Sequence, residues 1–146
     1  MIERPKLTKE MIAAAAAKFG ASNGWTDAEA DELASVCSGA HMDGYELAKA
    51  LDVNCGWIPT ALDVEILDGF RDLLRDELRQ ACIAWARDNN IEPPMPVGTM
   101  TTKGEITGIY AHDGACYEIR EPGDTNPTRR LIVRFEDARK APAANE

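Results

Sequence analysis

Apolar side chains recur at helical spacing over one long stretch of this sequence, which predicts its dominant element. Between Thr60 and Arg87, apolar residues are spaced three and four positions apart, which places them on one face of an α-helix. At about 1.5 Å per residue this helix would be roughly 40 Å long and would form the spine of a core. The residues expected to be buried along it are Leu67, Phe70, Leu74, Leu78, Ala81 and Trp85.

Three shorter helices are predicted ahead of this one by capping signals. A Thr or Asp side chain at the N-cap accepts a hydrogen bond from the first turn, and a Glu three residues later completes a capping box. A glycine after the last turn ends a helix because it adopts left-handed backbone without steric cost. On these rules the helices run from Thr8 to Phe19 with Gly20 as the stop, from Thr26 to Gly39, and, after Asp43 with Glu46, from Tyr45 to about Leu51.

The pattern changes after Arg87. Pro93, Pro94 and Pro96 cannot continue a helix, because proline lacks an N–H and fixes the backbone, so they belong to a connector. Asp113-Gly114 predicts a hairpin with a type I′ turn, in which both central residues take positive φ. The predicted β segments are Glu105–Tyr110, Ala115–Arg120 and Arg130–Phe135.

Five short segments of the C-terminal third form a recognisable series: Pro96–Thr99, Gly104–Ile109, the Asp113-Gly114 hairpin, Cys116–Ile119 and Leu131–Asp137. In this series the chain resembles the small SH3-like barrels that end many bacterial and phage proteins. The resemblance implies a meander of about five short strands and no particular ligand. Three strands are evident in the pattern, so a bare three-stranded sheet packed on the long helix stays open as the alternative.

Together these elements predict an α+β chain. The expected organisation is a four-helix domain over residues 1–90, a Pro-rich connector over 91–96, and a small antiparallel sheet or SH3-like barrel over 97–140. Residues 141–146 are expected to be a frayed tail. With 146 residues and 45% hydrophobic composition, the chain can bury one substantial core and is bounded at one compact unit or two small ones.

The composition also predicts a cytoplasmic protein. The apolar run from Met11 to Ala17 is too short and too Ala-rich for a signal peptide, and no segment reaches a membrane-spanning length. The four cysteines lack close spacing, which in a cytosolic chain favours reduced thiols over a disulfide framework. Leftover apolar positions on the long helix, at Leu62, Val64 and Ile83, could support a homodimer.

Charge gives the main indication of a partner. The formal net charge is -9, and residues 1–90 carry 16 acids against 9 bases. Such a chain repels nucleic acid and anionic membranes and attracts basic protein surfaces. Asp27, Glu29, Asp31 and Glu32 form a run without a base. By contrast, Asp68, Asp72 and Asp76 are each followed three positions later by an arginine, which predicts a solvated helix face whose charges pair with one another. The acidic run is either a set of helix-dipole and solubility charges or a docking surface for a basic partner.

Two aromatic residues complete the predicted partner-binding set. Tyr45 and Trp57 lie beside acidic segments, where an exposed aromatic side chain would anchor an interface. The alternative is that they have a purely structural role in the core, as is usual for aromatic residues at the start of helices in small bundles.

Two other hypotheses for the function remain. Arg120, Arg129, Arg130 and Arg134, with Tyr110 and Tyr117 nearby, could bind or tether nucleic acid, although acids are interspersed among them. Cys37, His41, His112 and Cys116 could form a zinc site or supply a thiol catalyst, although the close cysteine pairs of structural zinc sites are missing. The sequence contains no glycine-rich phosphate loop, Gly-x-Ser-x-Gly or His-Glu-x-x-His motif.

The leading expectation is therefore a non-enzymatic interaction protein without cofactor or metal. In size, acidity and helix-then-barrel layout the chain resembles the accessory proteins of phages and prophages. These include inhibitors of host defence such as anti-CRISPR proteins. That resemblance implies that the partner is a host defence protein whose basic, nucleic-acid-handling surface this chain would occupy.

Overall fold

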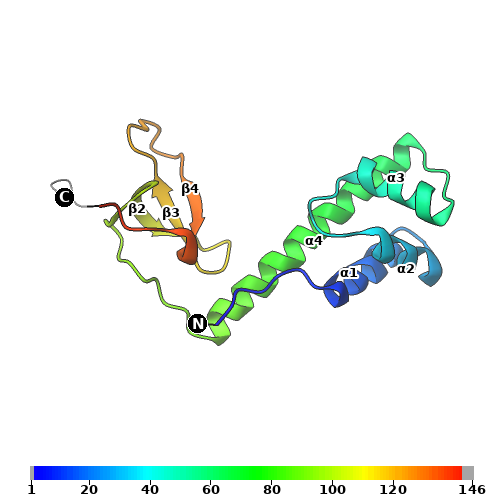
Figure 1. Cartoon of the computed structure of the whole chain (residues 1–146), viewed down its shortest axis with the longest axis horizontal. Helices are drawn as coiled ribbons and strands as arrows, with labels where there is room; N and C mark the ends of the chain where they lie inside the picture. Colours follow the sequence, from blue (N-terminus) through cyan, green and yellow to red (C-terminus); the bar gives the residue numbers. More distant parts are fainter. Residues whose placement is uncertain (1, 143–146) are drawn as a thin grey trace. The chain divides into compact units, whose positions relative to one another are not determined.

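The computed structural model describes residues 2–142 and has an α+β fold, which confirms the predicted class (Figure 1). By their contacts the residues form two compact units, Met1–Arg79 and Gln80–Glu146. The division lies inside the last helix, upstream of the Pro-rich connector that the sequence indicates as a boundary. The elements are α1 Lys9–Ser22, α2 Asp27–Val36, α3 Gly44–Cys55, α4 Ala61–Asp88, β1 Met100–Thr101, β2 Gly104–Ile109, β3 Cys116–Arg120, β4 Leu131–Arg134 and the 3-10 helix η1 Phe135–Asp137.

The predicted helix starts are confirmed at their caps. Thr8 Oγ1 accepts a hydrogen bond from the backbone N–H of Met11 at 3.1 Å, and Asp43 caps α3 in the same way through the N–H of Glu46. Thr26 and Glu29 form the full capping box of α2. Each of these bonds joins residues three positions apart, so the local sequence is enough to place them.

The helix ends differ from the prediction. α1 runs through Gly20 to Ser22, and Gly20 is buried where α1 meets α2. A Cβ at Gly20 would lie 3.1 Å from Cβ of Ala30, so this glycine permits close packing rather than ending the helix. α2 stops at Val36, before Gly39, and α3 continues to Cys55. Gly56 then ends α3 in the left-handed conformation with φ of 72°.

The first unit has a core formed by all four helices. Leu33, Leu47, Leu51 and Phe70 are completely buried in it. A line of ring contacts crosses this core, with centroid separations of 5.3 Å between Phe70 and Phe19, between Phe19 and Trp25, and between Trp25 and Trp57. Aromatic burial of this kind makes a large contribution to the stability of a small domain.

The burial predicted for α4 is correct only in its first half. Leu67, Phe70 and Leu74 are buried, but Leu78, Ala81 and Trp85 are only partly buried. The reason is that α4 contributes to two cores. Its apolar face belongs to the helical core as far as Leu74, whereas Trp85 packs against the core of the second unit.

The second unit is an antiparallel sheet with strand order β1-β2-β3-β4. Its core includes Ile106, Tyr117, Ile119 and Val133, which alternate with outward-facing residues along their strands. A register shift between Ile106 and Gly108 marks a bulge in β2. The buried Tyr117 hydroxyl bonds both the N–H and the carbonyl of Met95, at 2.8 and 3.2 Å, which attaches the Pro-rich connector to the sheet.

After η1 the chain returns to the sheet. Lys140 forms an isolated bridge with Thr101, and the N–H of Ala141 donates to the carbonyl of Met100 at 2.9 Å. This pairing adds a short segment beside β1, beyond the three strands evident in the sequence. The SH3-like resemblance stays a prediction. Of the frayed tail predicted over residues 141–146, positions 143–146 lie outside the described residues.

The connection between β2 and β3 is not the predicted type I′ turn. Positive φ is found at Ala115, at 54°, and not at Asp113 or Gly114. Gly114 is required for another reason, since a Cβ there would collide with the backbone carbonyl of Cys82 in α4. A tertiary contact therefore explains this glycine.

Candidate partner-binding surfaces

Only part of the acidic run on α2 is free to meet a partner. The Glu29 carboxylate accepts the backbone N–H of Thr26 at 2.9 Å, as part of the capping box. Glu32 Oε2 accepts the indole N–H of Trp57 at 2.5 Å. Asp27 and Asp31, one helical turn apart, are exposed. We call these two residues the acidic face.

Trp57 is partly buried and is held by contacts within the helical unit. Its ring lies edge-on to Trp25 at a centroid separation of 5.3 Å, and its N–H is bonded to Glu32. A buried or half-buried indole usually keeps such a partner. Trp57 therefore fixes the segment that follows α3, and its exposed edge is small compared with that of Tyr45.

Tyr45 has the exposure expected of an interface anchor. Its side chain is 64% exposed on the first turn of α3. It lies at an open groove of about 420 Å³ between α3 and the start of α4. Residues on both helices and on the segment joining them line this groove: Tyr45, Ala48, Lys49, Asp52, Pro59, Thr60, Ala61 and Val64.

The sequence did not single out this groove, although a signal for it exists. Tyr45, Lys49 and Asp52 are spaced four and three apart, which puts them on one face of α3. The opposing wall depends on how the chain turns at Pro59, and no local pattern predicts the angle between α3 and α4. The groove is therefore a product of tertiary packing.

The arrangement of acids and arginines on α4 is only partly the self-paired one that the sequence predicts. Asp76 and Arg79 form an ion pair at spacing three. Asp68 has a different partner, because its Oδ1 accepts the backbone N–H of Gly44 at 2.7 Å. Lys18 of α1 and Glu77 form a further ion pair at 2.7 Å. Much of the α4 charge is thus used within the helical unit.

Two of the thiols have environments that disfavour a nucleophile. Burial raises the pKa of the Cys37 thiol, against a smaller opposite effect of its hydrogen bond to the carbonyl of Gly39. Desolvation, followed by the nearby carboxylate of Glu32, raises the pKa of Cys55. A raised thiol pKa lowers the fraction of thiolate, which is the reactive form.

The Cys/His set is divided between the two units. Cys37 and His41 belong to the first unit and His112 and Cys116 to the second. His41 Nε2 lies 3.1 Å from Ser38 Oγ, and the His112 ring stacks edge-on against Tyr110. Within residues 2–142, no three His, Cys, Asp or Glu side chains are grouped so that they could hold a metal ion.

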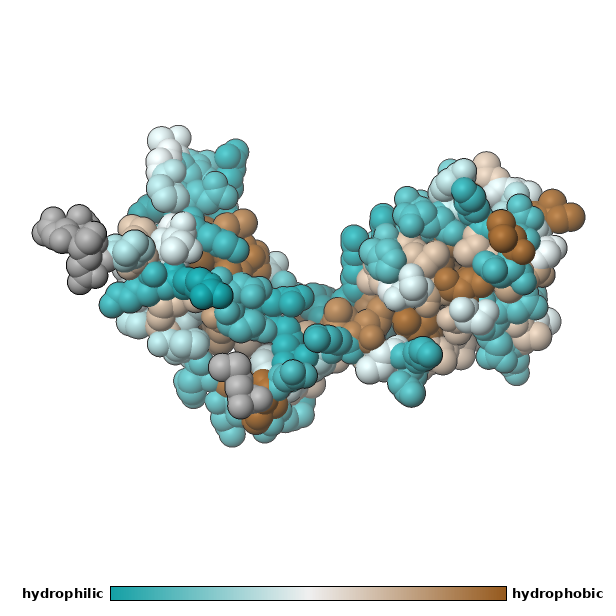
Figure 2. Space-filling view, in the orientation of Figure 1, coloured by the Kyte–Doolittle hydropathy of each residue, from teal (hydrophilic) through white to brown (hydrophobic). Residues whose placement is uncertain are grey.

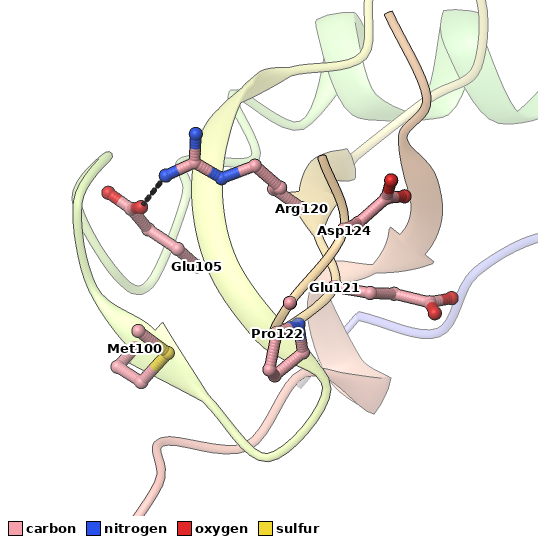
Figure 3. Close-up of a pocket in the computed structure, with 7 residues that line it drawn as sticks. Met100, Glu105, Arg120, Glu121, Pro122 and Asp124 are labelled. Carbon is pink, nitrogen blue, oxygen red and sulfur yellow. Dashed lines mark hydrogen bonds and ion pairs between the residues drawn. The ribbon is translucent and has the colours of Figure 1, made fainter. Parts of the chain in front are cut away.

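The arginines of the second unit have acceptors close by. Arg120 pairs with Glu105 across β2 and β3 at 2.7 Å, beside a small cavity of about 240 Å³ (Figure 3). Arg129 lies 3.8 Å from Asp124, and Arg130 donates to Thr107 Oγ1 at 3.0 Å. Arg134 is exposed on β4. Phosphate binding by this set would have to compete with the carboxylates of Glu105 and Asp124.

Comparison with protein-family models, curated proteins and solved structures found no match for this chain. Across residues 2–142, the helices lack the combination of length and apolarity needed to cross a membrane. The surfaces of the two units are therefore the features that indicate a function. Of these, the acidic face and the groove at Tyr45 lie in the same compact unit.

Proposed function

We propose that this protein is a non-catalytic interaction protein whose helical unit binds a basic surface of another protein. The observation that carries the proposal is the exposure of Asp27 and Asp31 on a chain of net charge -9. Among the described residues, neither carboxylate forms an ion pair. Complementary charge raises the rate of association and disfavours wrong partners.

The class of partner follows from the ability of carboxylates to take the place of nucleic-acid phosphates in a basic groove. A groove that handles nucleic acid presents Lys and Arg side chains to phosphates, and carboxylates accept the same charge-assisted hydrogen bonds. An acidic protein can therefore occupy such a groove in place of its nucleic acid. Under the anti-CRISPR-like proposal, the partner is a nucleic-acid-handling protein of host defence, and the effect of binding is inhibition.

The test uses purified RNA-guided DNA-binding complexes, each loaded with labelled target DNA. We expect the protein to displace the DNA from at least one of them, and displacement to weaken as ionic strength rises, because exposed charges are screened over about 8 Å at physiological salt. Reversing the acidic face with Asp27→Lys and Asp31→Lys should weaken displacement, mainly through slower association.

A matched control separates a specific face from overall charge. Glu10→Lys with Asp72→Lys changes the net charge by the same amount as the acidic-face variant. Both positions are exposed, and Glu10 also lies in the first turn of a helix. Equal weakening by both pairs would mean that only net charge matters, which contradicts a docking face. Direct binding of labelled DNA or RNA by the protein alone would instead favour the arginines of the second unit.

A further inference from the structure

The groove between α3 and α4 has an exposed aromatic side chain in one wall, and the segment that forms its other wall carries two further apolar residues that are exposed to solvent. Ile58 is 93% exposed and Leu62 is 64% exposed, and both are next to groove-lining residues in the chain. Tyr45, also 64% exposed, lies on the opposite wall. Figure 2 shows hydrophobic groups protruding at this end of the helical unit. Single exposed apolar residues are ordinary, whereas a group of them around a concave surface indicates a binding site.

We propose that this groove binds an amphipathic helix of the partner, with apolar side chains in the groove and Lys or Arg at its rim. This inference rests on the proposed function and specifies which part of the basic partner is recognised.

The backbone of the groove explains why the occupant is a helix. A peptide that binds by strand addition needs free N–H and carbonyl groups on its receptor, as at the edge of a sheet. Here the walls are helices, whose backbone groups are bonded internally. In the joining segment Pro59 has no N–H, and the N–H of Thr60 is bonded to Asp63 Oδ2 at 2.8 Å. Strand addition is therefore ruled out. The lining has a single aromatic residue, unlike the aromatic-lined grooves that take polyproline segments, so an amphipathic helix is the occupant that fits best.

The charge around the groove explains why that helix is basic. Asp52 lines the groove, and Glu46 and Glu65 are exposed next to lining residues, against the single base Lys49 in the lining. At the N-terminus of α4, which would otherwise attract an anion, Thr60 Oγ1 accepts the N–H of Asp63 and the Asp63 carboxylate accepts the N–H of Thr60, so a negative charge is already present there. A second copy of this acidic chain would bring like charges together, so a basic partner fits better.

The groove is held in shape before binding. The ring and N–H of Trp57 are fixed by Trp25 and Glu32, and Trp57 directly precedes Ile58 and Pro59. On the α3 side, Asp68 of α4 bonds the N–H of Gly44, next to Tyr45. A preformed site loses less conformational entropy on binding, which favours affinity.

The experiment uses a fluorescent helical peptide of about four turns, made of Leu on one face and Lys on the other. We expect it to bind the full chain, and Tyr45→Ser with Ile58→Ser, the first in the lining and the second beside it in the chain, to weaken binding about tenfold, because exposed apolar anchors carry most of the affinity of a site. Val97→Ser with Ile132→Ser is the matched control, since both residues are exposed in the second unit. It should leave binding unchanged.

Four outcomes would overturn the inference, three of them in the peptide-binding and sedimentation experiments and one in the DNA-displacement experiment. The first is equal binding by the groove variant and the unmodified chain, and the second is equal binding of a peptide with Glu in place of Lys. The third is a dimer in sedimentation that dissociates in the groove variant, which would make the groove a self-interface. If the groove variant displaces DNA normally while reversal of Asp27 and Asp31 prevents it, the proposed function stands and this inference fails. If the unmodified chain displaces no DNA but the groove tests succeed, the proposed function fails instead.

Discussion

Glu32 of α2 accepts the indole N–H of Trp57 at 2.5 Å, a bond that spans 25 residues of sequence. It joins the acidic helix to the segment that forms one wall of the groove. Glu32 therefore has a structural role, as Glu29 has in the capping box of α2. The consequence is that charge changes at Glu32 and at its neighbour Asp31 should have different effects.

Replacement of Glu32 by Ala should destabilise the protein by about 1–2 kcal/mol. A hydrogen bond to a charged acceptor contributes up to about 3 kcal/mol, and the partial exposure of this pair lowers its effect. Urea unfolding measures the change. Asp31→Ala is the control and should alter the free energy of unfolding by less than about 0.5 kcal/mol, because Asp31 is exposed. Equal effects would contradict a structural role for Glu32.

Two glycines should respond to alanine in opposite directions. At Gly44, a Cβ would collide with the carbonyl oxygen of Val64 and crowd Asp68, so Gly44→Ala should cost about 1–3 kcal/mol. At Gly69, in the interior of α4, the nearest atom to a Cβ would be Phe19 Cε2 at 3.8 Å, an ordinary contact. Gly69→Ala should therefore stabilise by about 0.5–1 kcal/mol, through helix propensity. Thermal unfolding of both variants checks the signs. Destabilisation by both would mean that α4 packs more tightly at Gly69.

The buried stripe of α4 predicts unequal costs for two leucines. Leu74 is 1% exposed, so Leu74→Ala should destabilise by about 2–4 kcal/mol, from lost transfer energy and the cavity left behind. Leu78 is only partly buried, and Leu78→Ala should cost less than about half as much. Urea unfolding of both variants, followed separately in each compact unit, measures the two changes in the free energy of unfolding. An equal or larger cost at Leu78 would show that the helical core extends beyond Leu74.

The cysteines predict a dependence on alkaline pH. The pKa of Cys37 is raised above its ordinary value of 9.0 because burial disfavours the thiolate. The unfolded chain therefore loses this proton first, so the stabilisation is fully present below about pH 9 and is lost as pH rises through the folded pKa. We expect Cys37→Ser to flatten the loss of stability above pH 9, in urea titrations at several pH values. An unchanged profile would assign the alkaline loss to other groups. Cys37→Ser should otherwise leave the protein folded, with a modest cost for the buried thiol.

What the sequence alone determined is local. Thr26 and Glu29, or Asp43 and Glu46, lie three positions apart, so their side chains meet the first turn of a helix whatever the rest of the chain does. The helical spacing of the α4 residues and the alternation in the strands are likewise properties of short windows. The class of fold and the start of each helix could be predicted for this reason.

Tertiary structure decided how the glycines and carboxylates are used. From the local sequence, Gly20 looks like a helix stop and Gly114 like a turn residue. In the structure each is needed because another segment approaches too closely for a Cβ. Asp68 was expected to face an arginine on its own helix, and it bonds Gly44 instead, 24 residues away. Such contacts depend on the angle at which helices pack, which no short window of sequence contains. For the same reason the exposed acids of α2 and the groove beside Tyr45 became distinguishable only once the chain was folded.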